Sequence, residues 1–573
     1  MKVSLSQNIQ QQNLSKSNTK NKKNDSIKTN NNNVSFKGAG VTALLDFLAT
    51  NPVWGATATD VGFMGTPTTV TEICRRGWGY GFEAGFREYT STINDSSLGL
   101  YGLAAGTLMA GALAKDGIKN PQRIFASNEA IDFHAEKWKN SGGDINKYID
   151  EYVESMKGFN PNSKKADANG YVSIADDLKQ GIKDDMKKLS EDNLDKKSVK
   201  KITERLNAKL VEATGAESSI LLKYGDKSVT SSVSTVTDDF YRMTKALKEN
   251  GALSKVDGLV SNLKKFGKGR ALLGLGAAMG ISACFQPINV WMTKKRTGSD
   301  GFGGDESRAK DNSAKFKALK LGSIAAMAGI TLASLKAKPT QFLDKMLFKG
   351  TAPTLDQFKG LYGTTILSRM WMSRDKDELR EVDIKSTLGF LNWLVFGNFV
   401  EKGVVMAFED KNNPILRYNK ENSKDGFLNK YFGEKVDKFF NSEISSRREI
   451  VTEALSTEAM KKKGASVLKS DGTAKSMKEL LKDFEKYSNN PIVKKNLKLK
   501  TIAQLAGYAY SGVVLGAGVP YLNISITNSI TNKRNKKKTQ EANLATAKNN
   551  FFEYQIKDSA FSKMKNVQDD AKK

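Results

Sequence analysis

The chain has 573 residues, of which 39% are apolar and 27% are charged. This length allows about two to four domains, and a mean hydropathy of −0.46 excludes a chain that lies mostly inside a membrane. The net charge of +28 suggests an anionic neighbour, whereas one His and two Cys exclude a disulfide framework and a zinc site built from His and Cys.

The N-terminal segment, residues 1–38, is rich in Asn, Gln, Lys and Ser. It lacks the apolar core that a cleavable secretory signal needs. We therefore expect a disordered basic tail.

Six apolar runs follow in chain order. They are Val41–Gly65, Ser97–Ala114, Ala271–Met292, Leu321–Leu335, Thr387–Phe408 and Ile502–Leu522. The second, third and sixth runs are uncharged, the first carries Asp46 and Asp60, and Glu401 and Lys402 interrupt the fifth. The fourth reaches only about 22 Å as a helix, so we expect it to dip into a bilayer or lie on its surface. The second, third, fifth and sixth runs give our best count of four membrane helices, with six as the upper limit.

Small residues recur at four-residue spacing within or beside these runs. The pairs are Gly102/Gly106, Gly276/Gly280 and Gly512/Gly516, and the triplet is Gly77/Gly81/Gly85. Such spacing lets helix backbones approach closely in lipid, and it allows homo-oligomers. The alternative, that the apolar helices form a soluble core, stays open.

The third and sixth runs end alike. "QPINVWMTKK" places Asn289 and Thr293 before a basic cluster, and "NISITNSITNKRNKKK" places Asn523 and Thr527 before another. Asn, Trp291 and the basic residues are typical of a membrane boundary, and the clusters favour the cytoplasmic side. The shared N-x-x-x-T spacing fits either a remote internal repeat or coincidence. Basic residues also precede the third run, at Lys264–Arg270, so the orientation is not fixed by charge.

The polar regions between the runs look helical. Val199, Ile202, Leu206 and Leu210 repeat at helical spacing before Gly215, which predicts a helix stop. Alternation typical of strands is nearly absent, so the predicted fold class is all-α: a helical membrane protein with Gly/Ala-rich apolar helices and polar helical insertions.

This organisation divides the chain into eight segments. They are the basic tail 1–38, an apolar region with the first membrane helices 39–114, a polar insertion 115–268, membrane helices with a basic Gly/Asp loop 269–340, an amphipathic segment and membrane helix 341–408, a polar insertion 409–500, a membrane helix 501–530 and a basic tail 531–573.

Two loops resemble ligand-binding motifs. "KADANGYVSIAD", Lys165 to Asp176, has part of the EF-hand grammar, but Lys165 stands where the first carboxylate belongs. We expect an Asx/Gly turn between helices rather than a Ca²⁺ site. The "GSDGFGGDES" loop, Gly298 to Ser307, lacks the strand, helix and GK[ST] end of a phosphate-binding loop.

Two segments combine both charges beside apolar runs. "ICRRGWGYGFEAGFREYTST" contains Arg75, Arg76, Glu83, Arg87 and Glu88. A polar groove between helices is one interpretation, and a membrane-surface helix is the preferred one. "SRMWMSRDKDELREVD", residues 368–383, also favours a membrane-surface helix.

No residues form a catalytic, cofactor-binding or metal-binding constellation. The single histidine, His134, lies in "AIDFHAEKW", which predicts a surface helix. We therefore expect no enzymatic activity, no cofactor and no metal.

Four blocks resemble an uncharacterised family of membrane-associated proteins from non-photosynthetic gut bacteria related to cyanobacteria. They are "NVSFKG", "QPINVWMTKKRTGSDGF", "RDKDELREVD" and "LGFLNWLVFGNFV". The resemblance implies a bacterial chain and carries over no activity and no functional residues.

The expected protein is a multi-pass protein of the cell inner membrane with cytoplasmic basic tails and a structural or envelope-organising role. Its expected partners are the lipid bilayer and anionic headgroups. Nucleic acid is a poor partner, because only 16 of the 90 basic residues are Arg. A small-solute transporter or channel, or a peripheral basic protein that binds lipid or nucleic acid, are the alternatives.

Overall fold

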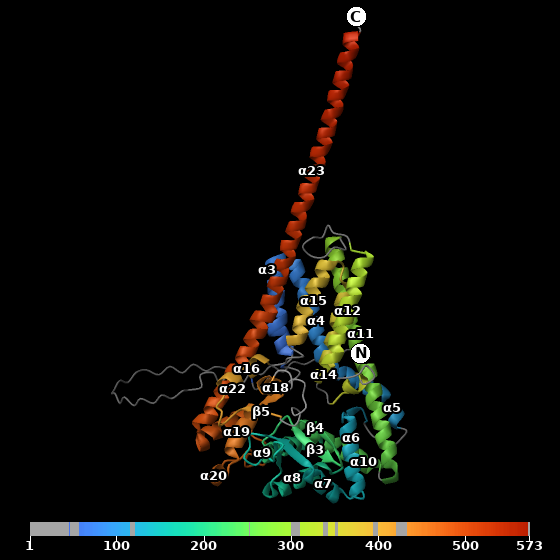
Figure 1. Cartoon of the computed structure of the whole chain (residues 1–573). Coiled ribbons are helices and arrows are strands. Elements are labelled where there is room, and N and C mark those ends of the chain that lie inside the picture. Colours follow the sequence, from blue (N-terminus) through green and yellow to red (C-terminus); the bar gives the residue numbers. More distant parts are fainter. Residues whose placement is uncertain are drawn as a thin grey trace, which may run out of the picture.

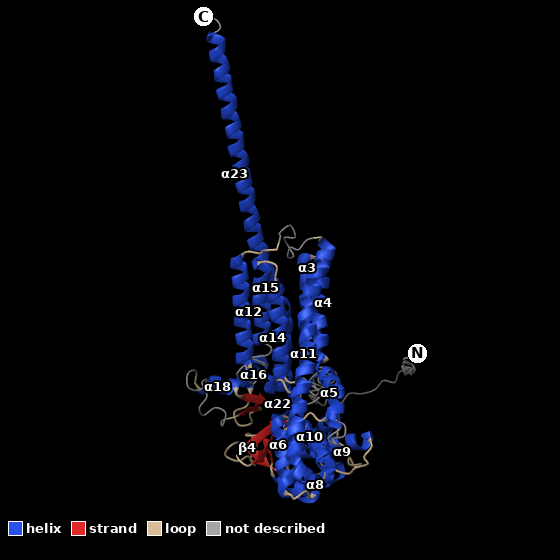
Figure 2. Ribbon diagram, turned by 90° about the vertical axis from the view of Figure 1, so that its right-hand side faces the viewer, coloured by secondary structure: helices blue, strands red, loops and turns tan. Residues whose placement is uncertain are grey.

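The computed structural model is an elongated, mostly helical molecule (Figures 1 and 2). It describes Leu45, Leu48, Gly55 and residues 57–114, 121–250, 253–298, 310–335, 342–349, 353–392, 399–419 and 433–570. Helices account for 77% of the structure and strands for 5%, which confirms the mostly helical prediction. The predicted N-terminal tail and most of the "GSDGFGGDES" loop lie outside the described residues.

A bundle of long helices forms the middle of the molecule (Figure 1). Its elements are η1 (Thr59–Gly65), α3 (Thr66–Arg76), α4 (Trp78–Ser96), α5 (Leu98–Ala114), α11 (Val256–Thr297), α12 (Ala314–Ser334), α13 (Phe342–Lys345), α14 (Leu355–Met372), α15 (Lys376–Phe390), η7 (Tyr510–Gly518) and the first part of α23 (Val519–Asp570). The rest of α23 leaves the bundle at one end, and two polar lobes cover the other end (Figures 1 and 2).

The first lobe combines helices with a small sheet. Its elements are η2 (Pro121–Arg123), α6 (Asn128–Asn140), α7 (Ile145–Glu154), β1 (Met156–Phe159), β2 (Tyr171–Ser173), α8 (Asp176–Leu189), α9 (Lys196–Thr214), β3 (Ile220–Tyr224), β4 (Lys227–Ser231), α10 (Val233–Asn250) and η3 (Leu253–Lys255). The strands lie in the order β2-β1-β3-β4 and pair antiparallel throughout.

The sheet of the first lobe was not predicted, because its strands are only three to five residues long and show little alternation. The helices behave as the sequence indicates. α9 ends at Gly215, which takes φ +65° and donates its N–H to Val211 O. This left-handed stop favours glycine, so the predicted helix end is confirmed.

The core of the first lobe is built around aromatic rings. Phe133, Tyr148, Tyr152 and Phe240 have no exposed surface, and their ring centroids lie 5.1–6.0 Å apart where they pack in pairs. Aliphatic side chains from the surrounding helices and from one face of the sheet complete this core. The lobe is therefore an α+β unit with its own packed core, attached to the bundle.

The second lobe is smaller. Its elements are α16 (Phe399–Phe408), β5 (Leu416–Tyr418), α18 (Glu434–Phe440), β6 (Ser442–Ile444), α19 (Arg447–Leu455), α20 (Glu458–Lys462), α21 (Met477–Asp483), η6 (Phe484–Ser488) and α22 (Pro491–Ala509). β5 and β6 form a two-stranded antiparallel sheet. The lobes touch through polar groups, since Arg417 donates to Gly215 O at 2.7 Å and the N–H of Glu217 donates to Glu449 Oε1 at 2.6 Å.

Among the described residues, three helices are long and apolar enough to span a membrane. They lie within Leu253–Thr297, Ala314–Ser334 and Pro491–Phe561. The predicted count of four to six is therefore not matched. The second run forms a shorter apolar helix, Leu98–Gly111, and residues 393–398 of the fifth run lie outside the described residues.

The prediction that the fourth run is too short to span a membrane is wrong for the helix that contains it. This helix, α12, begins at Ala314, seven residues before the apolar run. Ser313 caps this helix by accepting a hydrogen bond from Phe316 N, so the basic segment that precedes the run is helical too. At 1.5 Å per residue, the whole helix reaches about 30 Å.

Most of the small-residue pairs pack inside the bundle. Gly102 on α5 meets Gly274 on α11, where an added Cβ on Gly274 would lie 3.1 Å from the Gly102 backbone. An added Cβ on Gly516 would lie 2.5 Å from the Phe63 carbonyl oxygen. Gly276 and Gly280 have open space around them. In the described residues, the closely spaced glycines therefore allow helices of the same chain to pack together.

The EF-hand-like loop is an Asx/Gly turn, as predicted, but it joins two strands rather than two helices. Asp167 Oδ1 accepts hydrogen bonds from the N–H groups of Asn169 and Tyr171 at 3.0 and 2.9 Å. Gly170 takes φ +84°, and Lys157 pairs with the Asp167 carboxylate at 3.1 Å. The carboxylate thus holds the β1–β2 connection together.

Candidate functional site

The bundle has a charged interior. Ten ionisable side chains among its described residues are less than a tenth exposed, namely Glu72, Glu83, Asp95, Arg270, Lys359, Arg369, Arg374, Asp375, Asp377 and Glu378. Buried charges are costly unless they are paired, and each helix of the bundle contributes polar groups that meet those of its neighbours. The candidate site is built from these groups.

One glutamate is held by three side chains of α11. Glu83 on α4 accepts hydrogen bonds from Thr293 Oγ1 at 2.7 Å and from Arg296 Nε at 3.0 Å. Its backbone carbonyl accepts from Asn289 Nδ2 at 3.3 Å. We call this set of four residues the Glu83 clasp.

A second glutamate is held in the same way by α23. Glu381 on α15 accepts from Thr527 Oγ1 at 2.5 Å, and its backbone carbonyl accepts from Asn523 Nδ2 at 3.0 Å. Arg76 on α3 supplies two further hydrogen bonds to the carboxylate, at 2.6 and 3.2 Å. These four residues form the Glu381 clasp.

The local sequence explains why both clasps form. Residues four apart lie on one face of a helix, so an Asn and the Thr that follows it at this spacing reach the same partner. A proline precedes each Asn, at Pro287 and Pro520, and leaves the carbonyl four residues earlier without its helical donor.

Each carbonyl that a proline leaves open is satisfied from a neighbouring helix. Ala283 O accepts from Ser368 Oγ of α14 at 2.8 Å. Gly516 O accepts from Thr68 Oγ1 of α3 at 3.0 Å. The two long helices thus share three kinds of contact: an amide to a backbone carbonyl, a hydroxyl to a carboxylate, and a proline-opened carbonyl to a hydroxyl.

The helices that carry the two glutamates share a sequence pattern. Both read R-x6-E-x3-[RK]-x6-N, with members Arg76, Glu83, Arg87 and Asn94 in one copy and Arg374, Glu381, Lys385 and Asn392 in the other. The final asparagines each meet the long helix of their own copy, because Asn94 Nδ2 donates to Ala278 O and Asn392 Oδ1 accepts from Tyr510 OH.

The two N-x-x-x-T segments therefore make the same kinds of contact in two sets of helices, which we call the two halves of the bundle. Sequence reasoning noticed that spacing but missed its partner pattern, since only four of its positions match. Comparing the spacing of charged residues around Glu83 and Glu381 was the signal that could have found it.

The two halves meet at a cluster around Glu88 of α4. Its carboxylate lies 3.0 Å from Lys385 Nζ, 3.4 Å from Arg87 Nε and 3.9 Å from Arg369 Nη2. Arg87 belongs to one copy of the pattern and Lys385 to the other. Three cations thus surround one anion in the middle of the bundle.

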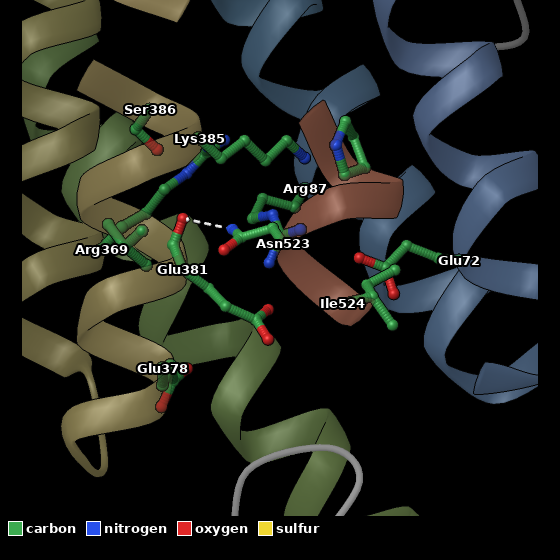
Figure 3. A pocket seen from close by; sticks show the side chains of 11 residues that line it. Glu72, Arg87, Arg369, Glu378, Glu381, Lys385, Ser386, Asn523 and Ile524 are labelled. Carbon is green, nitrogen blue, oxygen red and sulfur yellow. Dashed lines mark hydrogen bonds between the residues drawn. The ribbon is translucent and has the colours of Figure 1, made fainter. Parts of the chain in front are cut away.

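Two small cavities adjoin this cluster. One, of about 40 Å³, is lined by Glu72, Arg87, Arg369, Glu378, Glu381, Val382, Lys385, Ser386, Pro520, Asn523 and Ile524. Figure 3 shows Asn523 near its centre, with Arg369 and Lys385 to one side and Glu72 to the other. The other, of about 60 Å³, is lined by Glu72, Arg76, Tyr80, Glu83, Ala84, Arg87, Gln286, Asn289, Val290, Thr293, Arg374, Glu378 and Glu381. We call them the Asn523 cavity and the Asn289 cavity.

The prediction that two mixed-charge segments are membrane-surface helices is therefore wrong. Arg76, Glu83 and Glu88 face the interior, so their segment forms the polar groove that was the less favoured interpretation. Residues 368–383 comprise the end of α14 and the start of α15. Within them, Arg374 Nε and Glu378 Oε2 form a buried ion pair at 2.9 Å. Mixed charge beside an apolar run indicates burial here because oppositely charged partners lie on other helices.

His134 is also placed differently from the prediction. It lies on α6 but has no exposed surface, and its Nδ1 is 2.6 Å from Tyr148 OH. Burial lowers the pKa of this histidine to about 3. The residue therefore belongs to the core of the first lobe, far from the charged interior of the bundle (Figure 1).

The outside of the bundle is apolar, and one end carries a ring of aromatic residues. Trp78, Trp291, Trp371 and Tyr521 are all exposed there. Lys295 lies over the Trp291 ring, and Arg75 lies over the Tyr521 ring. The basic residues at the other end are paired with the first lobe or α13, because Lys264 contacts Asp132 and Lys268 contacts Asp344.

Within the described residues, no group of three or more His, Cys, Asp or Glu side chains is arranged to hold a metal ion. Cys74 and Cys284 are free thiols on the outside of α3 and α11. No protein-family model, no curated protein and no solved structure matches the chain.

Proposed function

We propose that the protein is a multi-pass membrane transporter that moves a small polar solute through the charged interface between its two related halves. The observation that carries this proposal is the pair of cavities at that interface, lined by charged residues from both copies of the repeated pattern. The proposal selects one of the alternatives that the sequence left open.

The membrane part rests on the distribution of side chains. Val70, Ile281, Ile288 and Val513 are among the large apolar residues exposed on the outside of the bundle, whereas its buried positions hold Glu, Arg, Asn and Thr. A water-soluble bundle has the opposite arrangement. An apolar exterior with an aromatic ring at one end is typical of contact with lipid and its interface.

The transport part rests on the interior. Ionisable side chains inside membrane bundles are expensive, and in such proteins they usually serve pathways for ions or solutes. Transporters are often built from two repeats, with the substrate site between them. Glu88, Arg369 and Lys385 occupy this position here.

The orientation follows from charge. Lys294, Lys295 and Lys315 lie at the aromatic end, and the cluster Lys533–Lys538 begins the projecting part of α23 at the same end. The positive-inside rule favours the cytoplasm for this end. The two lobes then lie on the opposite side of the inner membrane.

Topology can be tested with single cysteines. Cys74 and Cys284 are replaced by Ala, and a new cysteine is placed at Lys187→Cys on α8 or at Lys537→Cys on α23, both exposed. We expect a membrane-impermeant thiol reagent to label position 187 in cells with a permeable outer membrane, and position 537 only after lysis. Release of the protein from membranes by alkaline carbonate would contradict the membrane part.

Transport can be tested by counterflow in proteoliposomes with radiolabelled alanine, glutamate, betaine and methylammonium. We expect at least one solute to exchange, and Arg369→Met to reduce this exchange about tenfold or more because it removes a cation from the central cluster. Leu272→Met, on the exposed side of α11, is the matched control. If no solute in the panel exchanges, the transport part fails.

A structural, envelope-organising role is the second candidate, and the projecting helix favours it. Beyond Arg534, which pairs with Asp377, the side chains of α23 are exposed as far as the structure describes them. Leu544, Phe551, Tyr554 and Phe561 repeat at spacings of seven, three and seven, as in a coiled-coil seam. A chain truncated after Lys538 that still exchanges solute but loses a cross-linked partner would give the helix this separate role.

A further inference from the structure

The Asn289 cavity contains buried hydrogen-bond acceptors that have no donor. Gln286 and Asn289 are each 4% exposed, and the amide oxygens Oε1 and Oδ1 have no hydrogen-bond partner. The orientation of the Asn289 amide is set by its Nδ2, which donates to Glu83 O. A buried acceptor without a donor is costly, so it indicates a place where something else donates.

A carboxylate completes the set of acceptors. Glu72 on α3 is 8% exposed and lines the same cavity. Its contact with Arg76 Nη1 is long, at 3.4 Å, whereas Arg76 lies 2.6 Å from Glu381. The Glu72 carboxylate is therefore less tightly engaged than the other glutamates of the site.

The charged groups of the cavity balance. Its lining contains four carboxylates, from Glu72, Glu83, Glu378 and Glu381, and three guanidinium groups, from Arg76, Arg87 and Arg374. A fourth guanidinium group, that of Arg296, is not part of the lining but pairs with Glu83 at 3.0 Å. A hydrogen-bond donor that enters the cavity therefore meets the loosely paired Glu72 carboxylate and the two amide oxygens.

We propose that the Asn289 cavity binds a small primary ammonium group, which donates its three N–H bonds to Glu72, Gln286 and Asn289. An ammonium group has three donors and no acceptor, which matches one carboxylate and two amide oxygens. A volume of about 60 Å³ holds a few water-sized groups, enough for methylammonium. This inference names a solute class for the transport cycle and in that respect rests on the proposed function.

Other ligands fit less well. An anion would meet the Glu72 carboxylate and two amide oxygens, to which it has no hydrogen to donate. A divalent metal ion needs several converging carboxylate or imidazole ligands, and the part of the chain that the structure describes contains no such group. A quaternary ammonium ion carries the charge but has no N–H donor.

Binding can be measured by calorimetric titration of the purified full chain in detergent with methylammonium chloride. Tetramethylammonium and Na⁺ are the ligand controls, because both carry the charge without N–H donors. Gln286→Met removes one acceptor at similar volume, and Glu72→Gln removes the charge. Ile288→Met on the exposed face of the same helix is the matched control variant.

We expect saturable binding of one methylammonium per chain, about tenfold or more weaker in Gln286→Met and in Glu72→Gln, and unchanged in Ile288→Met. Equal binding of tetramethylammonium or Na⁺, no saturable binding to the unaltered chain, or unchanged binding by both cavity variants would overturn the proposal. A size-exclusion profile and circular dichroism spectrum like those of the unaltered chain show that a variant is folded.

The binding and transport results separate the two proposals. Methylammonium binding without exchange of any solute supports the cavity assignment and removes the transport part. Exchange of another solute without methylammonium binding supports transport and removes the cavity assignment.

Discussion

The bundle and the first lobe are arranged in opposite ways. The lobe encloses aromatic rings such as Tyr148 and Phe240 and turns its lysines outward, whereas the bundle encloses Glu378 and Arg374 and exposes residues such as Val513. Both are helical and both are well packed. As we propose, each region is matched to its own surroundings, the lobe to water and the bundle to lipid.

The largest expected effect comes from opening the Glu381 clasp. Glu381→Gln removes the carboxylate closest to Arg76, whose side chain is 7% exposed, and leaves that buried guanidinium with the longer 3.4 Å contact to Glu72. We expect a loss of about 3–5 kcal/mol in the free energy of unfolding. Thermal unfolding in detergent, followed by size-exclusion chromatography, measures the change.

The other clasp provides the matched control for this experiment. In Glu83→Gln the residue that loses its carboxylate partner is Arg296, whose side chain is 35% exposed and remains solvated. The loss should be smaller, about 1–3 kcal/mol. Equal losses in the two variants would contradict the assigned difference between the clasps.

The next effect tests the exterior of the bundle directly. Ile281→Lys places a charge on the exposed face of α11, near the middle of its apolar run. If this face meets lipid, the lysine makes the free energy of membrane insertion of the helix less favourable by about 2.5–3.5 kcal/mol. The amount of protein in the membrane fraction should then fall.

An exposed leucine in water is the reference for that substitution. Leu253→Lys, in η3 beside the first lobe, should change stability by no more than about 0.5 kcal/mol. Equal tolerance of both lysines would indicate that the bundle exterior faces water, and the comparison between the two regions would fail.

A smaller effect concerns the interior of the lobe. Burial lowers the pKa of His134 to about 3, whereas a histidine in an unfolded chain has a pKa near 6.5. The unfolded chain therefore binds the extra proton between these values, so this contribution to stability is present above pH 6.5 and is lost as the pH falls below it. The loss at pH 5 is about 2 kcal/mol.

Urea unfolding at pH 7.5 and pH 5 measures this dependence. In His134→Gln the contribution of the histidine should disappear. The free energy of unfolding should then differ between pH 7.5 and pH 5 by about 2 kcal/mol less than in the unaltered chain. The neighbouring groups Tyr148 and Tyr152 do not ionise in this range, because burial raises the pKa of both hydroxyls above the usual value. An unchanged difference would mean that His134 is solvated.

The smallest effect concerns the β1–β2 connection. Asp167→Ala removes two hydrogen bonds to backbone N–H groups and the pair with Lys157, and should cost about 1 kcal/mol. Millimolar Ca²⁺ should leave the melting temperature of the unaltered chain unchanged, because Lys165 occupies the first ligand position. A Ca²⁺-dependent increase that Asp167→Ala abolishes would restore the metal-site interpretation.

The sequence by itself determined the features that depend on near neighbours in the chain. Helical spacing and Gly215 defined α9 and its end, and uncharged runs located the apolar parts of α11 and of the α22–α23 segment. The spacing from Asn289 to Thr293 and from Asn523 to Thr527 placed each pair on one helix face. These are local properties, because helix periodicity and capping act within a few residues.

Only the tertiary structure decided which groups meet. Glu381 and Arg76 are separated by about 300 residues of chain, and neither segment contains information about the other that a single sequence can display. The same holds for the short strands of the first lobe, whose pairing depends on contacts across the fold, and for the basic residues Lys264 and Lys268, which are neutralised by distant acids. Charge pairing and strand pairing join residues far apart in the chain, which is why mixed-charge segments that looked like surface helices form the interior of the bundle.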